Sequence, residues 1–307
     1  MCVPFFSGRD REAVELALWI GQLNTIAGSE IPKIRHESIL GEFNCISTSI
    51  FSQVSNEQSL RLSPSAVSEY ENCPQQYKYR KIDKLPEPPS LDAERGTLVH
   101  TVLQDLFEIP AAGRTVESAI ELLPSRWSAQ LADKPDLLGM VTNEKEWLDR
   151  ASSLVKTYFA LENPKTFEAT HREMHLENDF DTNVYLHGYV DRLDVAPTGE
   201  VRIVDYKTGK APKPGWEEKA LFQLRVYALL YWKNNGVLPR LLQLIYLGDG
   251  KLVKSNPTMA ELEATEKVLR RVAKDIFISI EKEYWPPKTS RLCDWCYFKS
   301  ICPAHND

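Results

Sequence analysis

The chain has no apolar run approaching the roughly 20 residues that a helix needs to cross a bilayer. Its N-terminus also lacks a basic start followed by an apolar stretch, which is the pattern of a secretory signal. We therefore expect no membrane partner and a cytoplasmic location. Cysteine is scarce too, with six in 307 residues. In a reducing compartment such cysteines are free thiols or metal ligands rather than structural disulfides.

Positive charge is in deficit, because the formal net charge is −6. This balance on its face argues against a nucleic-acid partner, but the charge of a whole chain averages over its faces, and a metal-dependent site needs local acid. The stretch Arg61–Lys84 holds five basic residues against three acidic ones, interleaved with Tyr70, Tyr77 and Tyr79. That mixture fits either a surface for phosphates and bases or an ordinary solvated helix.

Two segments around a tight turn are predicted to form a β-hairpin. Apolar residues alternate along 184–195 and again along 200–206, which is the period of a strand. Residues 197–199, Pro-Thr-Gly, form a favourable loop, because proline suits a type I turn and glycine suits the left-handed position that follows. The predicted register therefore pairs Ala196 with Glu200, the residues next to the loop.

This register brings three charged side chains together. Asp191 falls directly opposite Asp205, and cross-strand neighbours have β-carbons about 4.5–5.5 Å apart. Two carboxylates at that distance repel each other unless a cation lies between them. Lys207 follows Asp205 by two residues, so the pleat puts both side chains on one face. The pattern indicates a divalent-metal site beside an ammonium group; solvated surface charges are the alternative, and a bulge at the loop would shift the register by one.

Four cysteines could bind one metal centre. Cys293, Cys296 and Cys302 have the spacing C-x2-C-x5-C, and Cys73 lies more than 200 residues earlier. Four thiolates suit either zinc or an iron–sulfur cluster, and the spacing does not choose between them. Such a site would tie the C-terminal tail to the start of the domain, and metal binding would contribute to folding. The remaining two, Cys2 and Cys45, are expected to be plain free thiols.

The other periodic segments predict an α/β sandwich of mixed strands flanked by helices. Helices are expected over 92–107, in several segments up to 162, and over 216–233 and 258–283, with further strands at 168–176 and 241–247. Residues 1–60 have no clear pattern and are treated as an N-terminal appendage to a domain of residues 61–307.

Two helical pairs also stand out. Gly96 and His100 share a face of the helix expected at 92–107, and a glycine inside a helix costs about 1 kcal/mol relative to alanine. We expect another element to approach closely there. Gln223 and Tyr227 share a face of the helix expected at 216–233. Taken alone, His100 reads as a structural residue, and the other pair as a polar rim on an apolar helix.

Taken in order, these motifs resemble the PD-(D/E)XK nuclease superfamily, specifically its RecB-like and AddB-like exonucleases with an iron–sulfur cluster. The resemblance covers about residues 61–307 and implies a restriction-endonuclease-like core, a central mixed β-sheet flanked by helices, with a helical insertion and a C-terminal cysteine cluster. The matching motifs are Ser63-Pro64-Ser65, Cys73-Pro74, Gly96–His100, Gly188–Asp194, Asp205–Gly209, Gln223 with Tyr227, and the cysteine tail.

The resemblance also implies roles for single residues. His100, Asp191, Asp205 and the backbone carbonyl of Tyr206 would hold Mg²⁺ or Mn²⁺, and Lys207 would orient or deprotonate the attacking water. Gln223 and Tyr227 would position the nucleic acid. A structural [4Fe–4S] cluster would be ligated by Cys73, Cys293, Cys296 and Cys302, with structural Zn²⁺ as the alternative.

The implied function is a metal-dependent DNA exonuclease that acts on single strands or DNA ends in repair or recombination. The chain contains no G-x4-G-K-[S/T] phosphate-binding loop. We therefore expect it to use existing single strands and ends, or strands opened by a helicase partner subunit. Two alternatives stay open: a non-catalytic nucleic-acid-binding subunit of the same fold that pairs with a helicase, and a nuclease acting on RNA, because nothing in the sequence reads a 2′-hydroxyl.

Overall fold

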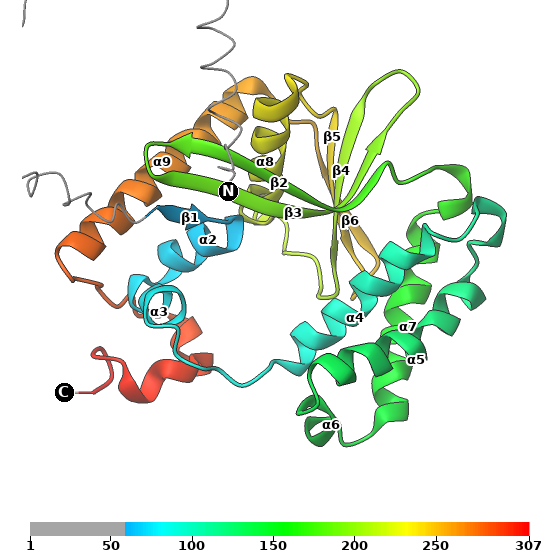
Figure 1. Ribbon diagram of the computed structural model, residues 1–307, viewed down its shortest axis with the longest axis horizontal. Coiled ribbons are helices and arrows are strands. Elements are labelled where there is room, and N and C mark those ends of the chain that lie inside the picture. Colours follow the sequence, from blue (N-terminus) through cyan, green and yellow to red (C-terminus); the bar gives the residue numbers. More distant parts are fainter. Residues whose placement is uncertain (1–58, 307) are drawn as a thin grey trace, which may run out of the picture. The chain divides into compact units, whose positions relative to one another are not determined.

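The computed structural model describes residues 59–306, which contain one mixed six-stranded sheet with helices packed on both faces (Figure 1). The fold class expected from the sequence is therefore confirmed. The predicted appendage at residues 1–60 lies outside the described residues, apart from its last two. Within the described part of the chain, no helix is long and apolar enough to span a membrane.

The sheet has the order β1-β3-β4-β5-β6, and β2 pairs with β3. Strand β3 is shared between several partners: β2 runs antiparallel along most of its length, β1 pairs with its first residues, and β4 pairs with its last. The pairs β1/β3 and β4/β5 are parallel, and the others are antiparallel. The strands are β1 Leu60–Leu62, β2 His171–Asp181, β3 Val184–Val195, β4 Val201–Lys207, β5 Leu241–Tyr246 and β6 Lys251–Ser255.

The hairpin between β3 and β4 has the predicted register. The N–H of Ala196 donates to the carbonyl of Glu200 at 2.9 Å, and Leu193 pairs with Ile203. Gly199 has a φ of 90°, the left-handed position that the loop needs. The regular pairing ends at Arg192 and Val204, so Asp191 and Asp205 lie just beyond it.

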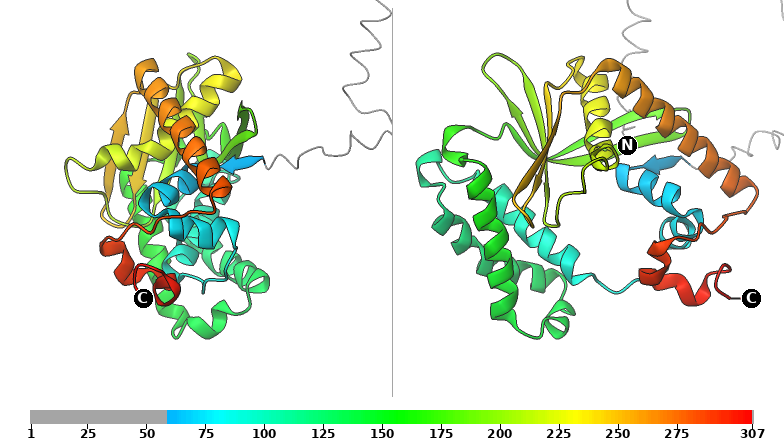
Figure 2. Two further views of the ribbon diagram at one scale, coloured as in Figure 1. Left: turned by 90° about the vertical axis from the view of Figure 1, so that its left-hand side faces the viewer. Right: turned by 180° about the vertical axis from the view of Figure 1, so that it is seen from behind.

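Two helical layers cover the sheet (Figure 2). Helices α2, α8 and α9 bury one core, and α4, α5 and α7 bury a second core against the other face. The helices are α2 Pro64–Asn72, α3 Pro74–Tyr77, α4 Leu91–Leu106, α5 Val116–Asp133, α6 Leu137–Met140, α7 Glu144–Leu161, α8 Glu217–Asn235 and α9 Met259–Glu281. The cysteine tail forms two 3₁₀ turns, Arg291–Trp295 and Tyr297–Ile301.

Local signals set several helix starts. The hydroxyl of Ser63 accepts a hydrogen bond from the N–H of Ala66 at 3.2 Å, and Pro64 occupies the first turn of α2. Thr258 forms a reciprocal capping box with Glu261 at the start of α9. These starts are determined by a few adjacent residues.

The sequence missed the short strands β1 and β6 and misplaced β2. The expected strand at 168–176 begins and ends later in the structure. Four of the five residues 177–181 are polar or acidic, which is unfavourable for a strand taken alone, but these four pair with β3. Pairing with β3 therefore extends the strand there, and the residues of this segment alone do not predict it.

The stretch Arg61–Lys84 does not offer its tyrosines to bases, so that part of the predicted phosphate-and-base surface is wrong. Tyr70, Tyr77 and Tyr79 are buried. The first two pack with Trp285, with ring centroids 6.3 and 6.0 Å from it. These rings form part of the core beneath α9, because burying their apolar surface is more favourable in free energy than leaving it in water.

Candidate active site

Strand β3 changes its alternation at Asp191. Val190 and Leu193 both belong to the core beneath α8 and α9, whereas Arg192 between them contacts Tyr158 and Tyr206 of the opposite layer. A regular pleat would put Val190 and Arg192 on one face. Asp191 therefore lies at the point where the regular alternation of side chains in β3 is interrupted.

Glu173 on β2 lies opposite this interruption. Its neighbours pair as Arg172 with Arg192 and Met174 with Val190, so Glu173 faces Asp191. The φ of Glu173 is 45°, a left-handed conformation that is uncommon for a residue with a side chain. Backbone strain of this kind concentrates at functional sites.

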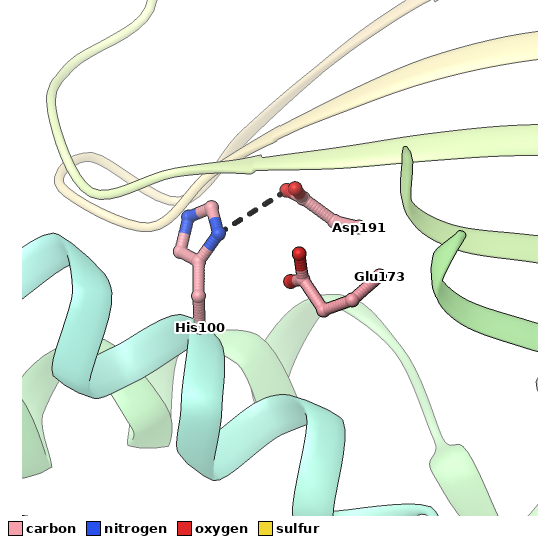
Figure 3. A group of neighbouring side chains, drawn as sticks. All are labelled: His100, Glu173 and Asp191. Carbon is pink, nitrogen blue, oxygen red and sulfur yellow. Dashed lines mark ion pairs between the residues drawn. The ribbon is translucent and has the colours of Figure 1, made fainter. Parts of the chain in front are cut away.

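His100, Glu173 and Asp191 form what we call the candidate metal group (Figure 3). Each offers one ligand atom, and these atoms all lie within 4.8 Å of one another. The Nδ1 atom of His100 lies 3.4 Å from Oδ2 of Asp191. Helix α4 supplies His100, β2 supplies Glu173 and β3 supplies Asp191, so three segments far apart in sequence converge here.

Asp205 and Lys207 lie beside this group at the end of β4. Asp205 is 1% exposed, and the Lys207 ammonium lies 2.7 Å from its Oδ2 atom. The N–H of Tyr206 donates to Oδ2 of Asp191 at 2.6 Å, which ties β4 to the candidate metal group. Asp205 and Lys207 lie on one face of β4, as the pleat predicts.

A hydrogen-bonded chain continues from Lys207 onto α8. Lys207 Nζ donates to Oε1 of Gln223 at 2.8 Å, and Nε2 of Gln223 donates to the hydroxyl of Tyr227 at 2.7 Å. Gly188 makes this possible, because a β-carbon there would lie 2.5 Å from a ring carbon of Tyr227. Of the two helix residues singled out by their spacing, Gln223 therefore contacts Lys207 on β4, and Tyr227 supports Gln223 and packs against Gly188 on β3.

Negative charge is in excess around these residues. Burial raises the pKa of Asp205 to about 7, and the charge of Asp191 adds to the shift while Lys207 opposes it. Burial and Asp191 also raise the pKa of Glu173. Burial lowers the pKa of His100, but its hydrogen bond to Asp191 and the nearby carboxylates outweigh burial and raise it overall. A bound cation would relieve this repulsion, and carboxylates with one imidazole suit Mg²⁺ or Mn²⁺.

Comparison with known proteins decides the family. The model of the PD-(D/E)XK nuclease superfamily matches residues 61–303. The chain belongs to this superfamily. Two phage proteins, each named Gene 69 protein, are similar to this nuclease: that of Mycobacterium phage D29 is 27% identical and that of phage L5 is 24% identical. Each alignment covers 79% of this chain and 96% of the relative.

A solved structure is similar to the nuclease as well. It is described as a "Putative exonuclease" from Eubacterium rectale, with 15% sequence identity and a TM-score of 0.49. The alignment covers 87% of this chain and 94% of that one.

The nuclease brings its four predicted cluster cysteines together. Cys73, Cys293, Cys296 and Cys302 are free and line one cavity of about 20 Å³. Polar hydrogens point at three of the sulfurs: the N–H groups of Lys288 and Ser290 lie 3.4 Å from the Sγ atoms of Cys73 and Cys293, and the amide of Gln76 lies 3.7 Å from that of Cys296. The tail thus meets the segment after α2, as the spacing suggested.

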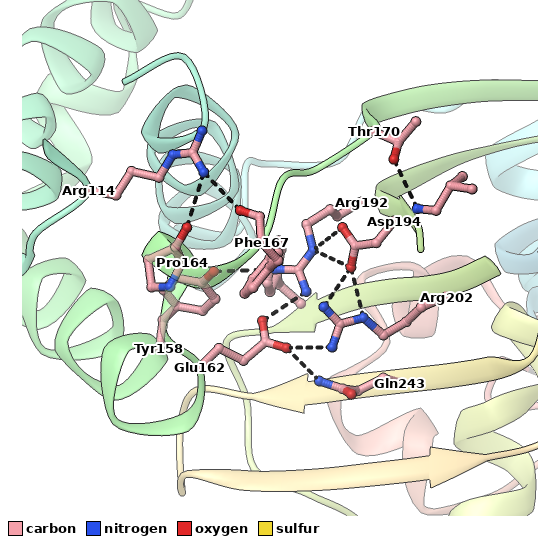
Figure 4. Close-up of polar contacts among 12 residues, drawn as sticks. Arg114, Tyr158, Glu162, Pro164, Phe167, Thr170, Arg192, Asp194, Arg202 and Gln243 are labelled. Atoms are coloured by element: carbon pink, nitrogen blue, oxygen red, sulfur yellow. Dashed lines mark hydrogen bonds and ion pairs between the residues drawn. The ribbon is translucent and has the colours of Figure 1, made fainter. Parts of the chain in front are cut away.

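A second polar cluster of the nuclease surrounds Arg192, the residue after Asp191 (Figure 4). Arg192 is fully buried. Its guanidinium lies 2.8 Å from Glu162 and 3.1 Å from Asp194, and it donates to the hydroxyl of Tyr206 at 2.7 Å. Arg202 pairs with the same two carboxylates at 3.1 and 2.7 Å. We call Arg192, Arg202, Glu162, Asp194 and Tyr206 the Arg192 cluster.

Sequence reasoning missed Glu173 in this nuclease. It lies among other polar residues of β2, and its side chain has no periodic or motif signal. Only its position opposite Asp191 reveals it. At Gly96, a β-carbon would lie 3.4 Å from the Thr208 hydroxyl, which is an ordinary van der Waals distance, so β4 ends beside this helix without requiring glycine there.

Proposed function

We propose that this nuclease is a Mg²⁺- or Mn²⁺-dependent exodeoxyribonuclease that acts on single strands or DNA ends in repair or recombination. The observation that carries the proposal is the convergence of the candidate metal group with Asp205 and Lys207 at one end of the hairpin. His100, Glu173, Asp191 and Asp205 would hold the cation, with the carbonyl of Tyr206 as a further ligand. A bound cation supplies charge neutralisation at the phosphate and hydroxide near neutral pH.

Lys207 is assigned the role of orienting the attacking water. Its Nζ atom is held between Asp205 and Gln223, so its position beside the candidate metal group is fixed. A lysine at this position also suits the negative charge that develops on the phosphate. Gln223 and Tyr227 support this position from α8 and would contact the nucleic-acid strand beside it.

The first test is a digestion series on labelled DNA with Mn²⁺. We expect linear single strands to be degraded from an end, circular single strands to resist, and Asp205→Asn to be inactive. Asp149→Asn is the matched control, because it makes the same chemical change at an exposed carboxylate on α7. Equal rates for Asp205→Asn and the unmodified protein would defeat the proposal.

The same series separates the alternatives. A wild-type protein that binds the strands without degrading them indicates a non-catalytic subunit, whose action then depends on a helicase partner. Faster degradation of an RNA strand of equal sequence indicates an RNA nuclease. Cutting of the circular strand indicates endonuclease action.

We also propose that Cys73, Cys293, Cys296 and Cys302 hold a structural [4Fe–4S] cluster. The four cysteines line one small cavity. The donors aimed at the sulfurs of Cys73, Cys293 and Cys296 suit thiolates that carry negative charge, as the ligands of such a cluster do.

Anaerobic purification followed by iron, sulfide and zinc analysis tests this second proposal. We expect a brown protein that contains iron and sulfide and that loses its colour and thermal stability in Cys296→Ser. Cys45→Ser is the matched control, because Cys45 has no metal-binding spacing. A colourless protein with one zinc per chain would show the zinc alternative to be correct.

A further inference from the structure

The ribbon formed by β2 and β3 carries a line of aromatic side chains. Tyr185, His187, His175 and Tyr189 follow one another, and we call them the aromatic row. Their ring centroids are 6.3 Å apart between the first two, 6.1 Å between the middle two and 4.6 Å between the last two. The first and last pairs are stacked, and the middle pair is T-shaped.

The aromatic row lies on the outer face of this ribbon. The residues that alternate with it in β3, Val184, Leu186 and Val190, are buried in the core beneath α8 and α9. By contrast, Tyr189 is 54% exposed and His175 is also exposed. A half-buried antiparallel ribbon needs only polar side chains on its outer face. Four rings in contact there are more than the fold requires.

One end of the row lies next to the candidate metal group. Tyr189 precedes Asp191 by two residues in β3, and His175 follows Glu173 by two residues in β2. Two residues of strand span about 7 Å. A chain lying along the row would therefore reach the candidate metal group without turning away from the sheet.

The other end of the row meets positive charge. The Arg61 guanidinium lies 4.5 Å from the centroid of the Tyr185 ring. Arg61 also lines a groove of about 940 Å³ whose wall carries Lys78, Lys81 and Lys84, against the acidic Asp83 and Glu283. Basic groups exceed acidic ones along this groove, which fits a phosphate backbone, whereas Asp179 and Asp181 line the neighbouring pocket that Arg61 shares with Tyr185. These basic residues are the ones that the sequence analysis singled out in Arg61–Lys84.

We propose that the aromatic row stacks on the bases of a single-stranded nucleic acid and guides that strand from the basic groove to the candidate metal group. The proposal rests on the proposed nuclease function of that group. A single strand exposes its base faces, whereas a duplex keeps them stacked on one another. Stacking also tolerates any base sequence, which suits an enzyme that degrades a strand progressively.

Glu177 helps to hold the rings in place. Its carboxylate accepts a hydrogen bond from the hydroxyl of Tyr185 and lies 3.5 Å from Nδ1 of His175. The two rings are therefore oriented before a strand arrives, which lowers the entropy lost on binding.

The test compares two oligonucleotides of equal length, one of thymidines and one of abasic sites, which share the backbone and differ in the bases. Binding of each to the full chain is measured by fluorescence anisotropy in EDTA, so that no hydrolysis occurs. We expect Tyr189→Ala and His175→Ala each to weaken thymidine binding by about fivefold or more, and to weaken abasic binding much less. Tyr189→Phe, which keeps the ring, should retain the preference for thymidine.

Arg61→Gln is the contrasting variant. Arg61 is expected to contact phosphates, which both oligonucleotides share. Its loss should therefore weaken the binding of both alike and reduce the salt dependence of binding. The proposal is overturned if the alanine variants weaken the binding of both oligonucleotides equally, or the binding of neither. Circular dichroism tests whether each variant is folded. If His175→Ala unfolds, Tyr189→Ala still decides the outcome, because Tyr189 is exposed.

A base-free substrate separates this proposal from the proposed function. Mn²⁺-dependent hydrolysis of bis(p-nitrophenyl) phosphate by the wild-type protein reports on the candidate metal group alone. Its absence counts against the nuclease function, whereas the ratio of thymidine to abasic binding still decides whether the row stacks on bases.

Discussion

The candidate metal group and the Arg192 cluster use neighbouring residues of the same strands but differ in charge balance. Asp191 belongs to the candidate metal group and Asp205 lies beside it, whereas the residues that follow them, Arg192 and Tyr206, belong to the Arg192 cluster. The Arg192 cluster matches two guanidiniums with two carboxylates. Around the candidate metal group, three carboxylates face one lysine and one histidine.

This difference separates a structural use of buried charge from a functional one. A buried ion pair is tolerated when each charge has a partner and enough hydrogen bonds. An excess of one sign raises carboxylate pKa values, as Asp205 and Glu173 show, and leaves a position that favours a cation. In the same hairpin, the Arg192 cluster thus stabilises the fold, whereas the unbalanced carboxylates at the candidate metal group favour the binding of a cation.

Asp205→Asn should give the largest effect and the clearest contrast. We expect Mn²⁺-dependent cleavage to fall about a thousandfold. A bound metal ion stabilises the transition state by several kcal/mol, and this stabilisation is lost when a ligand of the metal is removed. The free energy of unfolding in EDTA should rise at the same time, since one repelling charge is gone. Digestion rates and chemical denaturation measure the two quantities; a variant that loses both activity and stability would place Asp205 with the structural charges.

Arg192→Met should have the opposite signature. Removing one partner leaves Glu162 and Asp194 short of positive charge, and breaking such a buried network costs about 3–5 kcal/mol. Urea denaturation at neutral pH measures the loss. Arg270→Met is the matched control, because its guanidinium is exposed and its ion pairs lie at the surface. Similar losses for both variants would mean that the Arg192 cluster is not a structural unit.

The pH dependence of metal-free stability should report on the same imbalance. The pKa of Asp205 is about 7 in the folded protein against 3.8 ordinarily, so the protonated carboxyl is favoured by folding. Its contribution is complete at low pH and is lost as pH rises through about 7. The slope is at most about 1.4 kcal/mol per pH unit. Subtracting the curve of Asp205→Asn isolates this group, and parallel curves would contradict the assignment.

Glu173→Gln tests whether the left-handed residue on β2 belongs to the metal site. We expect Mn²⁺ affinity to fall about tenfold or more, since a carboxylate in or next to the coordination shell is lost. Isothermal titration calorimetry measures the change. Glu177→Gln is the control, because it alters a carboxylate of the same strand outside the candidate metal group. Equal affinity in both variants would remove Glu173 from the site.

Tyr206→Phe should have the smallest effect. Its hydroxyl accepts a hydrogen bond from Arg192, and losing one such bond costs about 1 kcal/mol. Thermal unfolding detects the change. Tyr297→Phe serves as the control, because that tyrosine is 58% exposed on the cysteine tail. A loss as large as that of Arg192→Met would make Tyr206 the centre of the Arg192 cluster.

Prediction from sequence succeeded where the determining contacts are local. The loop at 197–199 set the register of β3 and β4, and α9 begins next to Thr258, where the sequence predicts a helix start. It failed where a residue depends on a distant partner. The tyrosines near Arg61–Lys84 looked available for bases because Trp285, which packs against two of them, lies some 200 residues away.

The chain by itself determined the hairpin that carries Asp191, Asp205 and Lys207, since turn chemistry and strand alternation act between residues close in sequence. Only the tertiary structure decided which other side chains join them. Pairing of β2 with β3 placed Glu173 opposite Asp191, and packing of α4 delivered His100. Charge balance, which separates the candidate metal group from the Arg192 cluster, is a property of that three-dimensional neighbourhood, because electrostatic energies depend on distance and burial rather than on order along the chain.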